Sequence, residues 1–162
     1  MKHFLAAFQS IKNSYDSSVS RSSGLTCTTN VFEGCPGVRL YRTMWMSGMS
    51  GIFFSVWADE HSESARRLHY NIHALKLRQL KPYVITSRNF AEEFRQSFET
   101  IRKSWPNVSV EYGPQNLMQG WIEYRIETFE SDALRLLRQF SEMAPVIDGI
   151  LEERIAPARH RQ

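Results

Sequence analysis

Three strand-forming segments, separated by short glycine-containing breaks, constrain the fold of this chain more than any other feature. The segments cover residues 25–32, 38–46 and 52–58 and are rich in Thr, Val, Phe, Trp and Tyr, which strands favour. The breaks, at residues 33–37 and 47–51, each contain two glycines. Because short turns join neighbouring antiparallel strands, this pattern predicts a three-stranded meander.

Apolar residues at helical spacing predict four helices around this meander. The first lies at the N-terminus, the second covers residues 62–80, the third begins at Ser87 and ends before Pro106, and the last begins near Ser131. The second is predicted from one apolar stripe: Ala65, Leu68, Ile72 and Leu75. The third has the clearest pattern: Phe90, Phe94, Phe98, Ile101 and Trp105. We expect Pro145 to kink the last helix, because an interior proline removes a backbone hydrogen bond.

Two further strands are predicted in the second half of the chain. They cover residues 108–112 and 121–126 and are joined by a long loop over 113–120. The resulting order is α-βββ-α-α-ββ-α, without an internal repeat. It predicts a single-domain α+β fold, in which an antiparallel sheet of about five strands carries helices on one face. We expect a polar linker to follow the first helix within residues 1–24, and a frayed tail over 155–162.

The composition excludes several classes of protein. Of 162 residues, 42% are hydrophobic and 23% are charged, which is typical of a globular domain and excludes collagen and extended disorder. No segment approaches the roughly 18 apolar residues of a membrane helix, and the N-terminal apolar run is too short for a signal peptide. Cys27 and Cys35 are too few for a disulfide framework, and whether they pair is left open. We therefore expect a cytoplasmic protein that does not contact a membrane.

Motifs of the common enzyme classes are missing from the sequence. There is no glycine-rich phosphate loop and no dinucleotide fingerprint, which argues against the familiar ATP- and NAD-dependent enzymes, and no cofactor is expected. There is also no G-x-S-x-G motif and no cysteine in a recognisable catalytic context. These absences favour a non-catalytic protein.

The predicted helix over 62–80 carries the candidate binding site. Four polar residues follow one another at i, i+3, i+7 and i+10 and would line one side of it: Arg66, His69, His73 and Lys76. Two cations that bracket two imidazoles suit a phosphate, a carboxylate or an acidic protein surface, whereas the alternative is an ordinary solvated helix edge. We expect the 113–120 loop to add Leu117 and Met118 as a recognition loop, because it is long and weakly charged.

A metal site and a nucleic-acid site are the alternatives. His69 and His73 have the spacing of two zinc ligands on a helix, and Asp59, Glu60 or His61 would supply a third ligand. No glutamate stands between the histidines, so the metalloprotease motif is absent. Residues 61–104 hold nine basic and four acidic residues, within a chain whose net charge is only +3. This local excess would permit contacts with nucleic-acid phosphates.

These observations rank three functional hypotheses. The first is a small, non-catalytic interaction module, such as an adaptor, an inhibitor or an immunity-type protein, that binds an acidic or mixed protein surface. The second is nucleic-acid binding through the basic segment over 61–104. The third is a metal-dependent hydrolase. The oligomeric state is left open, a homodimer included. Phe53 and Phe54 are adjacent on a predicted strand and cannot both point inward, so we expect one of these rings to face out or to pack under the N-terminal helix.

Overall fold

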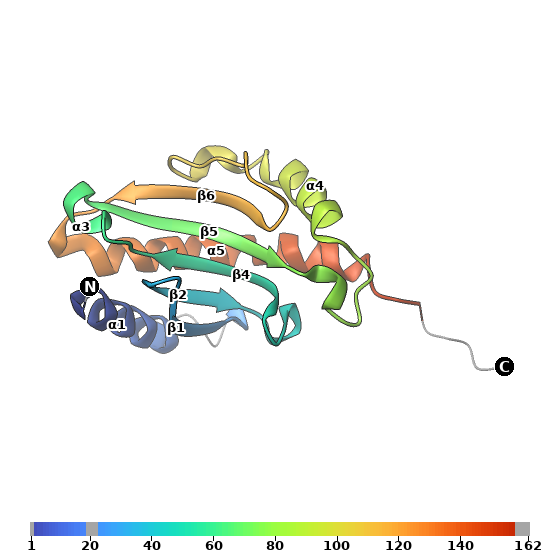
Figure 1. Ribbon diagram of the computed structural model, residues 1–162, viewed down its shortest axis with the longest axis horizontal. Helices are drawn as coiled ribbons and strands as arrows, with labels where there is room; N and C mark the ends of the chain where they lie inside the picture. Colours follow the sequence, from blue (N-terminus) through green and yellow to red (C-terminus); the bar gives the residue numbers. More distant parts are fainter. Residues whose placement is uncertain (1, 19–22, 158–162) are drawn as a thin grey trace.

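The computed structural model describes residues 2–18 and 23–157, which form an antiparallel sheet with long helices against one face (Figure 1). The helices and strands are α1 (Lys2–Ser18), β1 (Thr26–Phe32), β2 (Cys35–Tyr41), β3 (Met46–Ser47), β4 (Ser50–Trp57), α3 (Ser62–Ala65), β5 (Arg67–Leu75), α4 (Ser87–Phe98), β6 (Asn116–Glu123) and α5 (Phe129–Glu152). Short 3-10 turns lie at Thr43–Trp45, Leu77–Gln79, Arg102–Ser104 and Ile126–Thr128.

The strands lie side by side in the order β1-β2-β4-β5-β6, and the short β3 pairs with β4. Every pairing is antiparallel. Helix α1 packs against β1, β2 and α5, whereas α4 packs against β5, β6 and α5. In Figure 1 the long helix α5 runs behind the sheet. The predicted fold class is confirmed: an antiparallel sheet with helices on one face.

The predicted helix over 62–80 is wrong. A single helical turn, α3, ends at Ala65, where Arg66 takes a left-handed conformation with φ of 55°. Strand β5 begins directly afterwards. Leu68 and Ile72 explain the error, because a spacing of four residues places two side chains on one face of a helix and equally on one face of a strand. The apolar core-facing residues of β5 alternate with period two: Leu68, Tyr70, Ile72 and Ala74.

Strand β6 begins five residues before the predicted strand at 121–126 and includes most of the expected loop over 113–120. Gly120 suggests a turn in the sequence, but in β6 it makes room for a ring. A Cβ at this position would come within 2.3 Å of the Tyr70 hydroxyl oxygen. That hydroxyl donates a hydrogen bond of 2.6 Å to the carbonyl oxygen of Pro106. The glycine therefore reflects close packing between β5 and β6.

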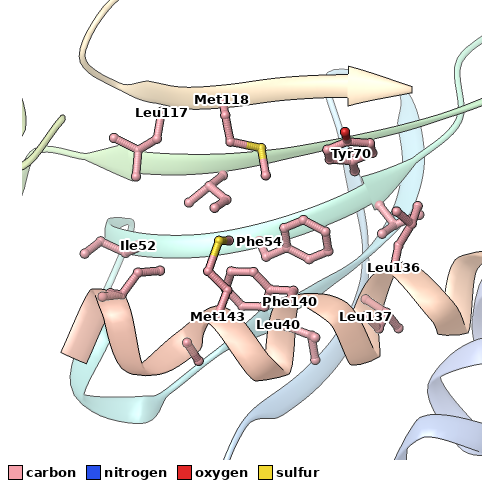
Figure 2. Packing of buried hydrophobic residues seen from close by; sticks show 14 of the residues in the cluster. Leu40, Ile52, Phe54, Tyr70, Leu117, Met118, Leu136, Leu137, Phe140 and Met143 are labelled. Atoms are coloured by element: carbon pink, nitrogen blue, oxygen red, sulfur yellow. The ribbon is translucent and has the colours of Figure 1, made fainter. Parts of the chain in front are cut away.

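Leu117 and Met118 are fully buried in β6, where Figure 2 shows them in the hydrophobic core. They are not part of an exposed loop, so the predicted recognition loop is wrong. The segment predicted as a strand over 108–112 forms an isolated bridge between Ser109 and Gln119. That bridge places it along the outer edge of β6.

The other helices differ from expectation mainly at their ends. Thr86, rather than Ser87, caps α4, since its Oγ1 accepts a hydrogen bond of 3.1 Å from the amide of Asn89. Helix α5 contains Pro145 and continues to Glu152. Residues 19–22 of the expected linker and residues 158–162 of the expected tail lie outside the described residues. None of the described helices is long and apolar enough to cross a bilayer.

The hydrophobic core fills the space between the sheet and the helices, and its buried residues form one cluster. Figure 2 shows side chains of β2, β4 and β6 facing those of α5. At the centre, the Phe54 ring stacks on Phe140 with centroids 4.4 Å apart and planes 6° apart. Near one end of α5, Arg42 donates to Asp148 from Nε at 2.9 and 3.0 Å. No described helix covers the opposite face of the sheet.

Candidate binding site on the open face of the sheet

The open face of the sheet has its own layer of side chains, formed mainly by β4 and β5. Register pairs Phe53 with His73, Ser55 with Asn71, and Trp57 with His69. These six residues alternate with core residues, so they point away from the helices. Phe53 and Phe54 therefore lie on opposite faces, as the sequence predicted.

The end of the β1–β2 hairpin curves over this open face. Phe32 is the last residue of β1 and pairs with Cys35, whereas the β1 residue nearest to the row of His73 is Thr26. In a flat sheet, the six residues between these rows would separate them by on the order of 20 Å. The Phe32 and His73 ring centroids are nevertheless only 5.8 Å apart. The face is therefore strongly concave.

This curvature creates a hollow of about 260 Å³ over the open face. Its lining comes from β1, β2, β4, β5 and β6 and from the turn residue Glu33. At its floor Phe53 is only 2% exposed although no described helix covers it. The guanidinium carbon of Arg39 lies 4.2 Å from the centroid of the Phe53 ring, and the His73 centroid lies 4.7 Å from it. Polar side chains thus cover this ring.

A directed chain of hydrogen bonds crosses the floor of the hollow. The indole Nε1–H of Trp57 can only donate, and it donates to Oδ1 of Asn71 at 3.1 Å. The Asn71 amide is thereby oriented, so its Nδ2 donates to Nε2 of His73 at 2.9 Å and, at 3.4 Å, to Oδ1 of Asn116. The Asn116 Nδ2 donates in turn to Oε1 of Gln119 at 2.9 Å. His73 Nε2 is therefore an acceptor, and its ring proton lies on Nδ1.

The histidines on this face are held in the neutral form. Burial, followed by the positive charge of Arg39, lowers the pKa of His73 to about 4. This agrees with the hydrogen bond that its Nε2 accepts. Burial also lowers the pKa of His69, whose ring stacks on Trp57 with centroids 4.5 Å apart.

Arg39 is the half-buried cation of the hollow, and it forms no ion pair within the described part of the chain. Its partner is Asn30. With the amide oxygen facing the guanidinium, Asn30 Oδ1 accepts from Nε at 2.9 Å and from Nη2 at 3.1 Å. Burial lowers the pKa of Arg39, but a guanidinium remains charged at neutral pH. A desolvated positive charge without a counter-ion costs free energy that an anion would recover.

Cys35 lies at the same hollow as a free thiol. Burial raises its pKa, and the negative charges of Asp59, Glu33 and Glu60 raise it further. The thiol is therefore protonated at neutral pH and is not an activated nucleophile. Cys27 is also free and is buried on the helix-covered side, where burial raises its pKa to about 12.

The structure separates the predicted ridge. His69 and His73 share the open face, because four residues is an even spacing in a strand. Arg66 and Lys76 instead lie outside β5, at its two ends, each exposed and in the left-handed region. A single cationic row on a helix is therefore wrong.

The predicted metal ligands do not converge either. Asp59 Oδ1 accepts from the amide of His61 at 3.0 Å and from Ser62 Oγ at 3.1 Å, while His69 stacks on Trp57. Among the residues that the structure describes, no group of three His, Cys, Asp or Glu side chains could hold a metal ion.

The basic residues of segment 61–104 are also distributed over different parts of the molecule. Arg67 lies on the open face with its guanidinium carbon 3.8 Å from the Trp121 ring centroid. Arg95 is on α4, where it donates to backbone carbonyls that include those of Tyr112 and Leu117. This side chain holds the segment before β6 in place.

Sequence reasoning missed most residues of the hollow, among them Arg39, Asn71 and Phe32. Arg39 and Asn71 are polar residues that alternate with apolar ones on strands, which was a usable signal for Arg39, since its strand was predicted. Asn71 was hidden by the helical interpretation. Comparisons with protein-family models, with curated proteins and with solved structures found no significant match to this chain.

Proposed function

We propose that this chain is a non-catalytic binding protein and that the hollow of its open sheet face receives an anionic group of a partner. The single observation that carries this proposal is Arg39, which is half-buried among rings and has no carboxylate partner in the described residues. Elsewhere in the molecule, the comparable Arg42 is neutralised by Asp148. The difference favours a site that is completed by a negative charge from outside.

The chemistry of the lining supports binding rather than turnover. The titratable groups at the hollow are Arg39, His73, Cys35 and Glu33. His73 is neutral, and its Nε2 is occupied by Asn71, so it is not placed to act as a base through that atom. The Cys35 thiol has a raised pKa, whereas nucleophilic cysteines have lowered ones. These properties do not match the requirements of general acid–base or covalent catalysis.

The adaptor- or inhibitor-type role predicted from the sequence requires that the anionic group belong to a protein. The rim of the hollow is suited to a larger partner, because Phe32 is 39% exposed at the curved end of the hairpin. Arg67 lies further along the same face, outside the lining of the hollow. An acidic or mixed protein surface therefore stays our proposal for the natural partner, on this face instead of the helix edge. Among residues 2–18 and 23–157, no contact favours nucleic-acid binding or metal-dependent hydrolysis.

A fragment titration followed by NMR tests whether the hollow is a binding site. The ¹⁵N-labelled chain is titrated with a small set of ring-containing fragments that are anionic, neutral or cationic. We expect shifts of the Trp57 indole N–H and of the Asn71 and Asn116 amide groups, which form the floor. The indole N–H of Trp45 is the internal control, because it donates to Asp148 on the helix-covered side.

Two results would reject the proposed function. One is that no fragment shifts the floor signals, or that shifts are confined to the helix surfaces. The other is a chemical change in a fragment during incubation with the protein, which would demonstrate turnover.

A further inference from the structure

We infer that the hollow selects a monocarboxylate joined to a flat apolar group, such as an aromatic ring. This inference rests on the proposed function and specifies the ligand chemistry of the same site. Three independent features carry it: the free edge of the Arg39 guanidinium, the net charge of the lining, and the rings that surround the cation.

The guanidinium of Arg39 has one edge occupied and one edge available. Arginine has five N–H donors, and Asn30 Oδ1 accepts one from Nε and one from Nη2. The three remaining donors lie on Nη1 and Nη2, at the outer end of the side chain. One N–H from each of these atoms forms the parallel pair that binds both oxygens of a carboxylate. The Asn30 contact also fixes the guanidinium plane, which reduces the entropy lost on binding.

The charge of the lining favours one negative charge over two. Arg39 is the cation among the described lining residues, since His73 is neutral. Glu33 lies at the same hollow and would repel additional negative charge. A phosphate monoester carries about −1.5 to −2 at neutral pH, whereas a carboxylate carries −1. A carboxylate therefore matches the site better than a phosphate does.

The body of the ligand is indicated by the rings and the volume. The ring centroids of Phe32 and Phe53 lie 5.5 Å and 4.2 Å from the guanidinium carbon of Arg39. The rings of His73 and Trp57 also line the hollow. Flat apolar groups pack well against such rings. The volume of about 260 Å³ is below the roughly 300–1,000 Å³ of sites for drug-sized ligands. It suits one ring or one side chain.

The test compares three probes on the full chain by NMR titration or calorimetry: 3-phenylpropionate, the neutral 3-phenylpropanamide, and phenyl phosphate. We expect the carboxylate to bind at least about tenfold more tightly than the amide. The carboxylate forms hydrogen bonds with Arg39 in which both partners are charged, whereas the amide offers Arg39 only a neutral acceptor. We expect phenyl phosphate to bind more weakly than the carboxylate. Equal or tighter binding of the amide or the phosphate would overturn the inference.

Variants of two arginines identify the residue responsible. Arg39→Met removes both the charge and the paired N–H donors of the guanidinium, so we expect it to weaken binding of 3-phenylpropionate by at least about tenfold. Arg39→Lys keeps the charge but not the paired donors, so we expect an intermediate loss of affinity. Arg67→Met is the matched control, because Arg67 also stacks on a ring of the open face, and it should leave the dissociation constant within about twofold. Unchanged affinity in folded Arg39→Lys would overturn the inference even if Arg39→Met did not fold.

A further titration with peptides distinguishes two sources of the carboxylate, a protein C-terminus and a small molecule. Acetyl-Ala-Ala-Phe with a free C-terminal carboxylate presents the same chemistry on a polypeptide, and its C-terminal amide is the control. Tight binding of the free-acid peptide assigns the group to a protein end, whereas binding of 3-phenylpropionate alone assigns it to a small molecule; both support the inference. If anionic fragments shift the floor signals more than neutral and cationic ones, but phenyl phosphate binds as tightly as 3-phenylpropionate, the proposed function stands and this inference fails.

Discussion

The two faces of the sheet bury neighbouring rings in different ways. Phe54 is 0% exposed and stacks on Phe140, so carbon atoms of a helix cover it. Phe53 is 2% exposed, but Arg39 and His73 cover it. The two rings are therefore buried to nearly the same extent but by different kinds of neighbour. On the helix side this burial is the packing that stabilises the fold, whereas on the open side it depends on polar groups with hydrogen-bonding requirements of their own.

The largest effect is expected from removing each of the two rings, Phe54 and Phe53, in turn. Phe54→Ala should lower the free energy of unfolding by about 3–5 kcal/mol, because it leaves a cavity in a close-packed core. Phe53→Ala should cost less than half of that, since the side chains of Arg39 and His73 can relax over the space. Urea denaturation of both variants measures the difference. Equal losses would mean that the open face is as essential to folding as the core.

The next effect concerns pH and is expected only from the open face. His73 has a pKa of about 4 in the folded chain, compared with about 6.5 when unfolded. Above pH 6.5 it is neutral in both states and has no effect. As the pH falls from 6.5 towards 4, the unfolded chain takes up a proton that the folded chain does not, so the free energy of unfolding decreases by up to about 3 kcal/mol.

Two measurements check this linkage. His73→Gln should remove that part of the pH dependence of urea unfolding, while keeping an acceptor for Asn71. Arg39→Met should raise the pKa of His73 as followed by NMR, because the guanidinium charge contributes to its depression. A His73 pKa near 6.5 in the native protein would contradict the description of the open face as a desolvated layer.

The same contrast explains how much of the fold was predictable. The helix-covered side rests on repeated apolar patterns, such as that of Phe90, Phe94 and Phe98 in α4, and these patterns identified most helices and the first three strands. The predicted helix over 62–80 was wrong because one pattern fits two structures. Leu68 and Ile72 satisfy both the helical and the strand period, and for this reason strand β5 was predicted as a helix.

The open-face site was less predictable because its residues converge only in three dimensions. His69 and His73 were selected from sequence, but for a helix that does not exist. The pairing of Arg39 with Asn30 and its position over Phe53 depend on strand register and on the curvature of the hairpin. Neither property can be derived from local periodicity, since both are set by contacts between strands.

A smaller effect should follow from the hydrogen-bond chain. Asn71→Ala leaves the Trp57 indole N–H without its acceptor and His73 Nε2 without its donor, so we expect a loss of about 1–2 kcal/mol. Asn71→Asp keeps the acceptor but places a negative charge beside His73, which should raise the pKa of that imidazole. Urea unfolding and NMR titration measure these effects. If Asn71→Ala costs nothing, the chain of hydrogen bonds does not order the open face.

The smallest effect is expected at the outer part of the open face. Arg67 is exposed, and its guanidinium lies 3.8 Å from the centroid of the Trp121 ring. Exposed cation–π contacts contribute about 0.5–1 kcal/mol, and methionine keeps part of the contact area, so Arg67→Met should cost less than about 1 kcal/mol in urea unfolding. Arg39→Met removes a cation that burial penalises, and its net cost should be similarly small although Arg39 is more buried. If Arg39→Met instead destabilised the chain as much as Phe54→Ala, Arg39 would be a structural residue, and the distinction between a packed face and a binding face would be lost.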